Sequence, residues 1–334
     1  MPPLLFLVAT LATFAAINGI LVLGLNLQFG TAGILNLAYI AIVAVGAYAT
    51  GIAELPSAPA HNLVIQYVGG FGLGPIPSVL FGVLVATAFT FVLGSLAFLR
   101  LREDYLGLTL FAVQSGLLLI TTNYQPFLDG DRGLLGLQGP LESTLDPSLY
   151  ELLMLSISLV CLAIVWIVVA RIDRAPLGRA LRALREDELA VASMGRDPWR
   201  LKVQAFIVGG AIAGLGGSLF AVYVGGWGPE AWQPGETLAL FAAIFVGGRG
   251  RPLGVLVGSI IVLELIGQAS LFLPDIAGRP DLLPALQEIV AVLLLLGFLW
   301  WSPRGLMPER KERFGTEPNS GRLRGQHDRL VDPA

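Results

Sequence analysis

Long apolar stretches, separated by short polar connections, fill the chain up to about residue 301. Because an α-helix rises about 1.5 Å per residue, roughly 20 apolar residues are needed to cross about 30 Å of hydrocarbon. The candidate crossings are residues 4–25, 30–52, 76–99, 105–122, 149–169, 203–224, 236–248, 252–273 and 282–301. The pattern predicts an all-α fold, a polytopic transmembrane helix bundle of about nine spans formed by residues 1–301.

The seventh stretch, residues 236–248, is short for a simple crossing. Its 13 residues would form a helix of roughly 20 Å. Two interpretations remain open at this point. The segment is either a short tilted helix or a broken element buried inside protein, where the bilayer tolerates irregular backbone.

Basic residues orient the spans, because short loops rich in Lys and Arg stay on the cytoplasmic side. All but two of the 21 Lys and Arg lie at 100–102, in the connection 170–202, at 249–251 and from Arg304 onward. The connections in between hold only Arg132 and Arg279. The two sets alternate, which predicts an external N-terminus and an internal C-terminus.

Polar side chains interrupt two of the apolar stretches. The amides and hydroxyls are Asn26, Gln28, Thr31 and Asn36, and the acid is Glu264. One interpretation is a polar lining for a solute path, because ionisable and amide groups at membrane depth usually face a cavity or another helix. The blander interpretation, hydrogen bonding between packed helices, is favoured for all five. The glycine-rich segment 213–226 is likewise predicted to be a close-packing face.

Composition excludes most kinds of chemistry. The chain is 55% apolar and 13% charged, with a single Cys161 and only two histidines, His61 and His327, far apart. This pattern predicts no disulfide, no metal site and no catalytic residues. A nucleotide-binding P-loop needs a lysine after glycine, whereas Lys202 and Lys311 follow Leu and Arg. The tail, residues 302–334, mixes basic and acidic residues with Pro and Gly, which predicts a disordered cytoplasmic segment that binds no nucleic acid.

The connection 170–202 carries eight Lys or Arg and five Asp or Glu. Pro176 suits a first helical turn, and Gly195 followed by Pro198 supplies a stop. Between them, an apolar stripe broken by Glu188 predicts a surface helix with one face to bury; its members are Leu177, Leu181, Leu184 and Val191. Such a helix either docks on a protein partner or lies on lipid headgroups. The five acids favour the protein partner.

The chain resembles the membrane permease subunits of branched-chain amino-acid ABC importers, in particular the M-type subunit. Its most specific part is residues 175–232, APLGRALRALREDELAVASMGRDPWRLKVQAFIVGGAIAGLGGSLFAVYVGGWGPEAW. The resemblance continues through IFVGGRGRPLGVLVGSIIV, LREDYLGLTL and NLQFGTAGILNLAYIAIVAVGAYA, and covers most of residues 20–306.

This resemblance implies a permease without its own ATPase activity, which forms half of the pathway for branched-chain amino acids or similar small solutes. The implied partners are an H-type permease as the other half, two cytoplasmic ATPase subunits and an extracytoplasmic solute-binding protein. The implied location is the plasma (inner) membrane of a prokaryote, within the lipid bilayer. This chain would bind no cofactor, because ATP would be used by the partner subunits.

The resemblance also implies that residues 177–195 dock on an ATPase and transmit nucleotide-driven motion to the membrane helices. The residues carried over for this role are Leu177, Arg179, Leu181, Arg182, Leu184, Arg185, Glu186, Asp187, Glu188 and Gly195. Five of them are expected to be exposed for the partner, namely Arg182, Arg185, Glu186, Asp187 and Glu188.

Three segments depart from the family pattern. Glu188 lies seven residues before Gly195 and lacks the following alanine of the importers' E-A-A-x-x-x-G loop. Arg249 and Arg251 stand where apolar or small residues are usual, and residues 128–137 replace a T-G-G-x-x-G-L segment. Two other classes stay open: an ion-coupled secondary carrier of small amino or carboxylic acids, which commonly shows inverted repeats, and a membrane scaffold that transports nothing.

Overall fold

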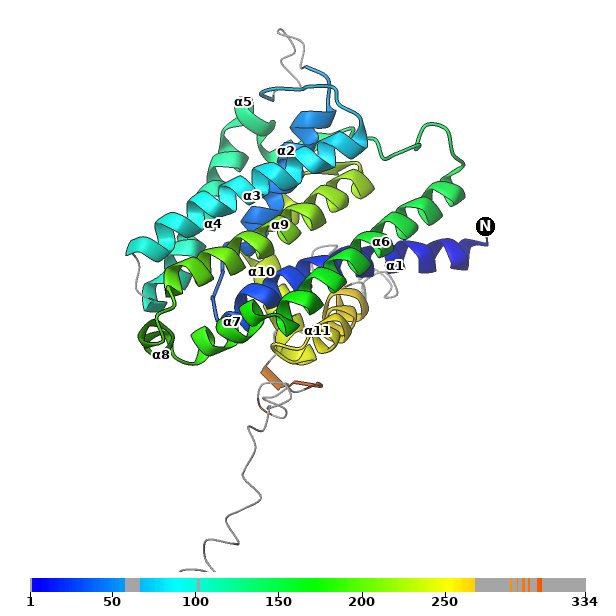
Figure 1. Cartoon of the computed structure of the whole chain (residues 1–334). Helices are drawn as coiled ribbons and strands as arrows, with labels where there is room; N and C mark the ends of the chain where they lie inside the picture. Colours follow the sequence, from blue (N-terminus) through cyan, green and yellow to red (C-terminus); the bar gives the residue numbers. More distant parts are fainter. Residues whose placement is uncertain are drawn as a thin grey trace, which may run out of the picture.

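The computed structural model describes residues 2–57, 67–100, 103–267 and 305–307, together with isolated positions between 289 and 300. Helices dominate this part of the chain, as the apolar pattern predicts (Figure 1). Five helices are long and apolar enough to cross a membrane. They are α1 (Pro3–Leu25, extended by the π-helix η1, Asn26–Thr31), α3 (Pro75–Arg100), α4 (Glu103–Asn123), α6 (Pro147–Arg174) and α9 (Pro198–Val224).

Shorter elements complete the described fold. Three are apolar: α2 (Tyr39–Glu54), α10 (Pro234–Gly247) and α11 (Pro252–Ser259), which continues as the π-helix η4 (Ile260–Ile266). The others are α5 (Gln125–Leu128), η2 (Gly130–Arg132), β1 (Leu134–Leu135), α7 (Pro176–Glu186), α8 (Glu188–Ser193), β2 (Gly226–Trp227) and η3 (Pro229–Trp232). The strands β1 and β2 pair antiparallel.

Eight of the nine expected crossings correspond to one of these apolar helices. Most of the ninth, residues 282–301, lies outside the described residues, and so does the tail from residue 308. The second crossing is shorter than expected, because residues 32–38 are largely non-helical and α2 begins only at Tyr39. Five long and three short helices therefore account for the described part of the predicted bundle.

Helix α9 occupies the centre of the bundle and packs against α1, α2 and α3. Its glycines allow this closeness: a Cβ placed on Gly46 of α2 would lie 2.7 Å from the Cα of Gly214. On the same side of α9, Gly217 lies against the backbone carbonyl of Val43. Small residues let membrane helices approach backbone to backbone, so the expectation of a close-packing face in 213–226 is confirmed.

Contacts between connections follow the alternation that the basic residues predict. Connections expected outside meet one another, since Leu134 pairs with Trp227 and Tyr67 bridges to Leu128. At the other end, the amides of Leu306 and Met307 donate to the carbonyls of Val246 and Gly247, 2.9 and 3.1 Å away. Figure 1 shows α7 and α8 at an end of the bundle away from the N-terminus.

The short seventh span is a half-length helix that follows irregular backbone. The strand β2 and the 3-10 helix η3 precede α10, and Trp232 of η3 is 2% exposed, with its ring edge-on to that of Tyr48 in α2. Thr237, one turn into α10, accepts a 3.4 Å hydrogen bond from the amide of Ile40 at the start of α2. Residues 236–248 therefore form one short, continuous and largely buried helix that follows irregular backbone.

Candidate functional site

The loop predicted as one helix forms two, α7 and α8, separated at Asp187. This residue is extended, with φ −156° and ψ 108°, and its carboxylate accepts hydrogen bonds from the amides of Leu189 and Ala190 at 2.8 and 3.0 Å. Asp is among the best residues for such a cap, because it satisfies amides that the first turn leaves unpaired. The expectation of a continuous helix over 177–195 is wrong for this reason.

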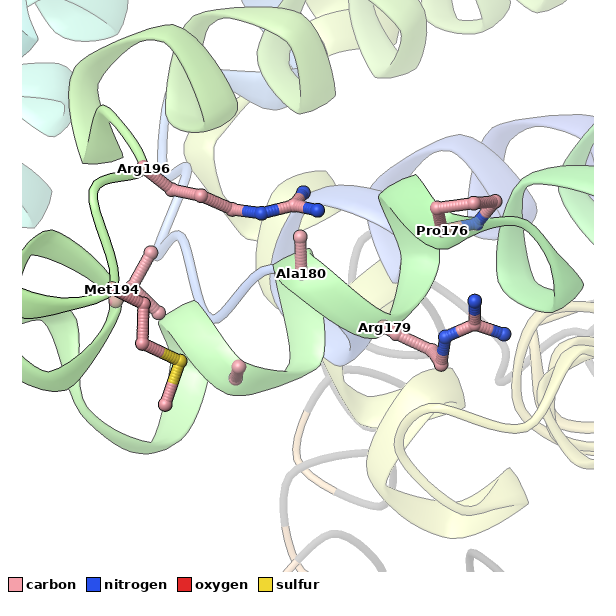
Figure 2. A pocket seen from close by; sticks show the side chains of 7 residues that line it. Pro176, Arg179, Ala180, Met194 and Arg196 are labelled. Carbon is pink, nitrogen blue, oxygen red and sulfur yellow. The ribbon is translucent and has the colours of Figure 1, made fainter.

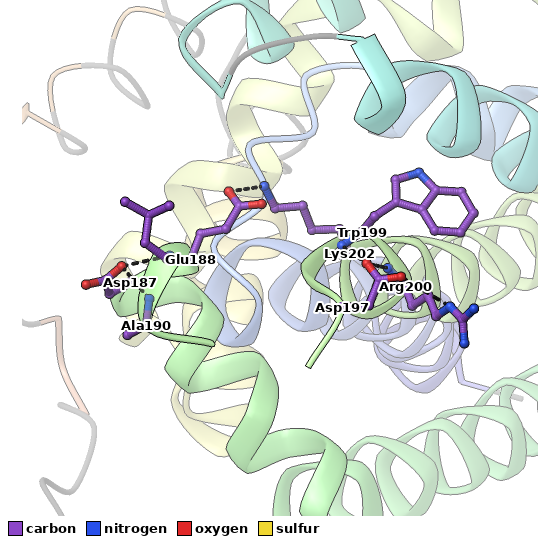
Figure 3. Close-up of polar contacts among 8 residues, drawn as sticks. Asp187, Glu188, Ala190, Asp197, Trp199, Arg200 and Lys202 are labelled. Atoms are coloured by element: carbon purple, nitrogen blue, oxygen red, sulfur yellow. Dashed lines mark hydrogen bonds and ion pairs between the residues drawn. The ribbon is translucent and has the colours of Figure 1, made fainter. Parts of the chain in front are cut away.

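An ion pair joins helix α8 to the first turns of α9, which has its own charged cap (Figure 3). The Lys202 ammonium lies 2.6 Å from a carboxylate oxygen of Glu188. Asp197 caps α9 by accepting from the amides of Trp199 and Arg200, and its other oxygen lies 3.2 Å from the Arg200 guanidinium. Glu188 therefore bonds within the chain and is half-buried, not fully exposed as expected.

Helix α7 divides its side chains between the bundle and the outside. Leu181 and Leu184 are buried, and Leu177 is half-buried, as the stripe predicts. Arg179 and Glu186 are exposed, and Asp187 and Gly195 beyond them are exposed as well. Gly195 has φ +78°, a left-handed conformation that favours glycine, and it ends α8 as expected.

Two arginines of α7 turn inward, which corrects the expectation that they are exposed. Arg182 is half-buried and donates to the backbone carbonyl of Asp173 at 3.1 Å. Arg185 is half-buried and donates to the backbone carbonyl of Gly30. The helical stripe could not reveal this, because the acceptors are backbone carbonyls at the ends of other helices. Both guanidiniums hold α7 to the membrane bundle.

A shallow hollow of about 210 Å³ lies between α7 and α8 (Figure 2). Ala180, Ala183, Val191 and Met194 give it apolar walls, while Pro176, Arg179 and Arg196 complete the lining. Figure 2 shows Arg196 extending toward Ala180 of α7. The residues that form the hollow contribute two positive charges and no acid. The site therefore suits an apolar side chain accompanied by negative charge.

The polar residues expected at membrane depth meet at the connection between α1 and α2, called here the α1–α2 junction (residues 26–38). Gln28 donates to the carbonyl of Phe206 in α9 at 2.9 Å and accepts from the Asn36 amide at 2.8 Å. Asn36 in turn accepts from the amide of Ala38 at 3.0 Å, just before α2. The Asn36–Ala38 bond satisfies a backbone amide in the non-helical segment, and the two Gln28 bonds join that segment to α9.

The other two amide and hydroxyl residues connect the junction to its neighbours. The side-chain oxygen Oδ1 of Asn26 accepts a 3.0 Å hydrogen bond from the backbone amide of Gly250, in the turn between α10 and α11. Thr31 donates to a carboxylate oxygen of Asp173 at 3.3 Å. The amide nitrogen of Asn26 is buried without a hydrogen-bond partner among the described residues. All four of these polar residues are at most 1% exposed.

Glu264 lies apart from this group, in the π-helix η4. One carboxylate oxygen accepts from the Asn18 amide of α1 at 2.8 Å, and the other is buried without a hydrogen-bond partner in the described part of the chain. The structure thus brings four of the five candidates together and leaves Glu264 separate.

Sequence reasoning missed several residues of the loop. Arg196 and Met194 line the hollow, and Lys202 anchors α8. A signal was available for part of this, because Val191 and Met194 are three residues apart, as are Ala180 and Ala183, so each pair shares a helix face. Lys202 carried no such signal, since its partner Glu188 is 14 residues away.

Residues 7–299 match the family described as branched-chain amino acid transport system / permease component. The chain belongs to this family. Similar proteins include the high-affinity branched-chain amino acid transport system permease proteins LivM of Salmonella typhimurium, 28% identical over 95% of this chain and 73% of that protein, and of Escherichia coli, 29% over 89% and 69%. The probable LivM of Methanocaldococcus jannaschii is 28% identical over 86% of this chain and 89% of its own length. No solved structure matches.

Membership in this family confirms the resemblance drawn from residues 175–232 and favours a transport permease over an ion-coupled carrier. The apolar helices and the family together identify a multi-pass membrane protein. Among the described residues, no group of three His, Cys, Asp or Glu could hold a metal ion.

Proposed function

We propose that this permease forms half of the translocation pathway of an ABC importer for branched-chain amino acids, and that separate ATPase subunits drive it. Three named relatives are permeases of branched-chain amino acid transport systems and align with 86–95% of this chain. The observation that carries the coupling part of the proposal is the exposed α7–α8 unit, which surrounds a hollow and is bonded to the membrane helices behind it.

The α7–α8 unit is the proposed docking surface for a cytoplasmic ATPase. Arg179, Glu186, Asp187 and Gly195 are exposed there, and the hollow between the helices offers apolar walls beside two guanidiniums. The side chains that face the bundle hold the unit to it. They are Leu177, Leu181, Leu184, Arg182, Arg185 and Glu188. A partner that inserts an apolar side chain flanked by an acid would use both features.

The remaining partners follow from the same proposal: an H-type permease as the other half of the pore, a second ATPase subunit and an extracytoplasmic solute-binding protein. The assembly would reside in the plasma (inner) membrane of a prokaryote. ATP would bind to the partners and no cofactor to this chain, whose two lysines lack the P-loop context.

For the solute path, the five polar candidates divide by whether their bonding groups are all in use. Gln28, Thr31 and Asn36 bond to neighbouring segments, which supports a role in packing. Asn26 and Glu264 each keep a buried polar atom without a partner in the described chain. Such atoms are costly unless something else pairs with them, so these two residues are the stronger pathway candidates.

Reconstitution of the chain with the products of its neighbouring genes tests the proposal. The complex is purified in detergent, placed in proteoliposomes and assayed for ATP hydrolysis and for uptake of radiolabelled L-leucine. We expect ATPase subunits to co-purify and uptake to require ATP and the binding protein. A chain that purifies alone and moves leucine under an ion gradient, without ATP, would overturn the proposal in favour of a secondary carrier.

Charge reversal tests the docking surface within this assay. Arg196→Glu places a negative charge beside the hollow and is expected to weaken co-purification of the ATPase, because it removes attraction and adds repulsion. The control is Arg171→Glu, which makes the same change at an exposed position at the end of α6. Equal co-purification of both variants with the ATPase would exclude the hollow as the docking site.

A further inference from the structure

The α1–α2 junction is hydrogen-bonded to α7, to α9 and to the turn between α10 and α11. It begins with the π-helix η1, and just beyond that helix the backbone amides of Ala32 and Ile34 donate to the carbonyls of Leu27 and Gln28, at 3.2 and 2.8 Å. A π-helix is rare and frequently marks a functional site in a helix. The junction interrupts the helical ladder between α1 and α2, so its residues can change conformation without unwinding either helix.

On its cytoplasmic side, the junction is bonded to the connection 170–202, called here the coupling loop. The Arg185 guanidinium of α7 donates to the Gly30 carbonyl, and the Arg185 side chain also underlies Gly33, where a Cβ would lie 2.8 Å from its Cγ. Thr31 bonds to Asp173 at the end of α6, whose backbone carbonyl accepts from Arg182. Any displacement of α7 must therefore either move residues 30–33 or break these bonds.

On its other side, the junction is bonded to the turn between α10 and α11. The side-chain oxygen of Asn26 accepts a hydrogen bond from the backbone amide of Gly250, and the Arg249 guanidinium lies 5.4 Å from the centre of the Phe29 ring. Phe241 and Phe245 of α10 stack edge-on against the same ring, at centroid distances of 5.0 and 5.5 Å. The basic residue that departs from the family pattern at 249 thus binds the junction.

We propose that Arg185 and Gly30 are positioning residues, through which motion of the coupling loop passes into the α1–α2 junction and from there to α10 and α11. The inference rests on the proposed function, because it specifies how nucleotide-driven motion of α7 reaches the membrane helices. Interfaces packed this tightly switch between discrete arrangements and do not deform continuously. The junction is the one element that bonds to α7, α9 and the α10–α11 turn at once, within the described chain.

Gly30→Ala is the sharpest test. A Cβ at Gly30 would collide with Oδ1, the side-chain oxygen of Asn26, and would lie 2.8 Å from the backbone amide nitrogen of Gly250. It is therefore expected to break the link to the α10–α11 turn without replacing any residue of α7 or α8. We expect the ratio of leucine moved to ATP hydrolysed to fall about tenfold in proteoliposomes, a typical size for a lost coupling interaction.

Gly116→Ala is the matched control, because a Cβ at that position of α4 meets nothing within 4 Å. Its transport ratio should equal that of the original protein. Arg185→Gln is expected to lower the ratio as Gly30→Ala does, and Arg185→Lys, which keeps a charged donor, should restore part of it. A Gly30→Ala protein that retains the original ratio would overturn the inference.

Hydrogen exchange of peptides covering residues 26–38 gives a second readout, which separates coupling from stability and applies even where a variant transports nothing. In the original complex, exchange here should change when a non-hydrolysable ATP analogue is added. In Arg185→Gln this nucleotide response should disappear, whereas a purely structural role would raise exchange equally with and without nucleotide. Failure of the ATPases to co-purify with the original chain would instead refute the proposed function itself.

Discussion

Asn18 of α1 donates a 2.8 Å hydrogen bond to Glu264 of η4, across 246 residues of sequence. The bond joins the first membrane helix to the eighth apolar segment. Asn18→Leu should lower the free energy of unfolding by roughly 1–3 kcal/mol, because it leaves a buried carboxylate oxygen without its donor. Thermal unfolding in detergent measures the effect, with Asn123→Leu at the exposed end of α4 as the control.

A double variant separates packing from transport at the same pair. Replacing both partners, Asn18→Leu with Glu264→Leu, should recover much of the lost stability, since no buried polar group then lacks a partner. If Glu264 lies on the solute path, this stable double variant will still take up leucine poorly. Normal uptake by the double variant would limit Glu264 to helix packing.

Asp187→Ala should loosen α8. The substitution removes the acceptor for two amides, a loss of about 1 kcal/mol for a helix cap, while Asp187→Asn keeps an acceptor and should behave like the original protein. Hydrogen exchange of a peptide covering residues 188–195 measures the change. Equal protection in the Ala and Asn variants would show that the cap does not stabilise α8.

We expect the interaction energy between Lys202 and Glu188 to be small and to depend on salt concentration. A double-mutant cycle with Glu188→Ala and Lys202→Ala should give less than about 1 kcal/mol, because the carboxylate side chain is 37% exposed. The value should decrease from low to high ionic strength, as screening shortens the Debye length from roughly 30 Å to 3 Å. A coupling energy that does not change with salt would mean that the two residues interact through packing.

Gly46→Ala should destabilise the contact of α2 with α9. The added methyl group meets the backbone of Gly214, which cannot rotate away as a side chain would. Overpacking of this kind costs about 1–3 kcal/mol. The yield of folded protein and its unfolding temperature measure the effect, and Gly116→Ala provides a control in which the methyl group meets no neighbour.

The helix positions that depend on hydrophobicity and on prolines could be predicted from the sequence. The long helices α3 and α6 lie within a few residues of the expected spans, and Pro176 begins α7 as expected. The glycines of 213–226 were also assigned to packing on sound grounds, because few other roles fit small residues in the interior of an apolar helix.

The parts that could not be predicted depend on distant backbone acceptors. Arg185 finds the Gly30 carbonyl 155 residues away, and Asn26 pairs with Gly250 across 224 residues. Neither bond leaves a periodic trace, so the inward arginines of α7 looked like a charged outer face. The break at Asp187 did have a local signal, an Asp directly before a short helical run, but the longer stripe across it suggested one helix.

The contact between Gly46 and Gly214 bears on how proteins of this family diverge. Backbone meets backbone there, so a larger residue at one position cannot be offset by a smaller one at the other. A larger residue is therefore disfavoured at each of the two positions, whatever solute the permease carries. Relatives that changed their cargo should still have small residues at both positions, and a bulky residue at either would mark a lineage in which these two helices have separated.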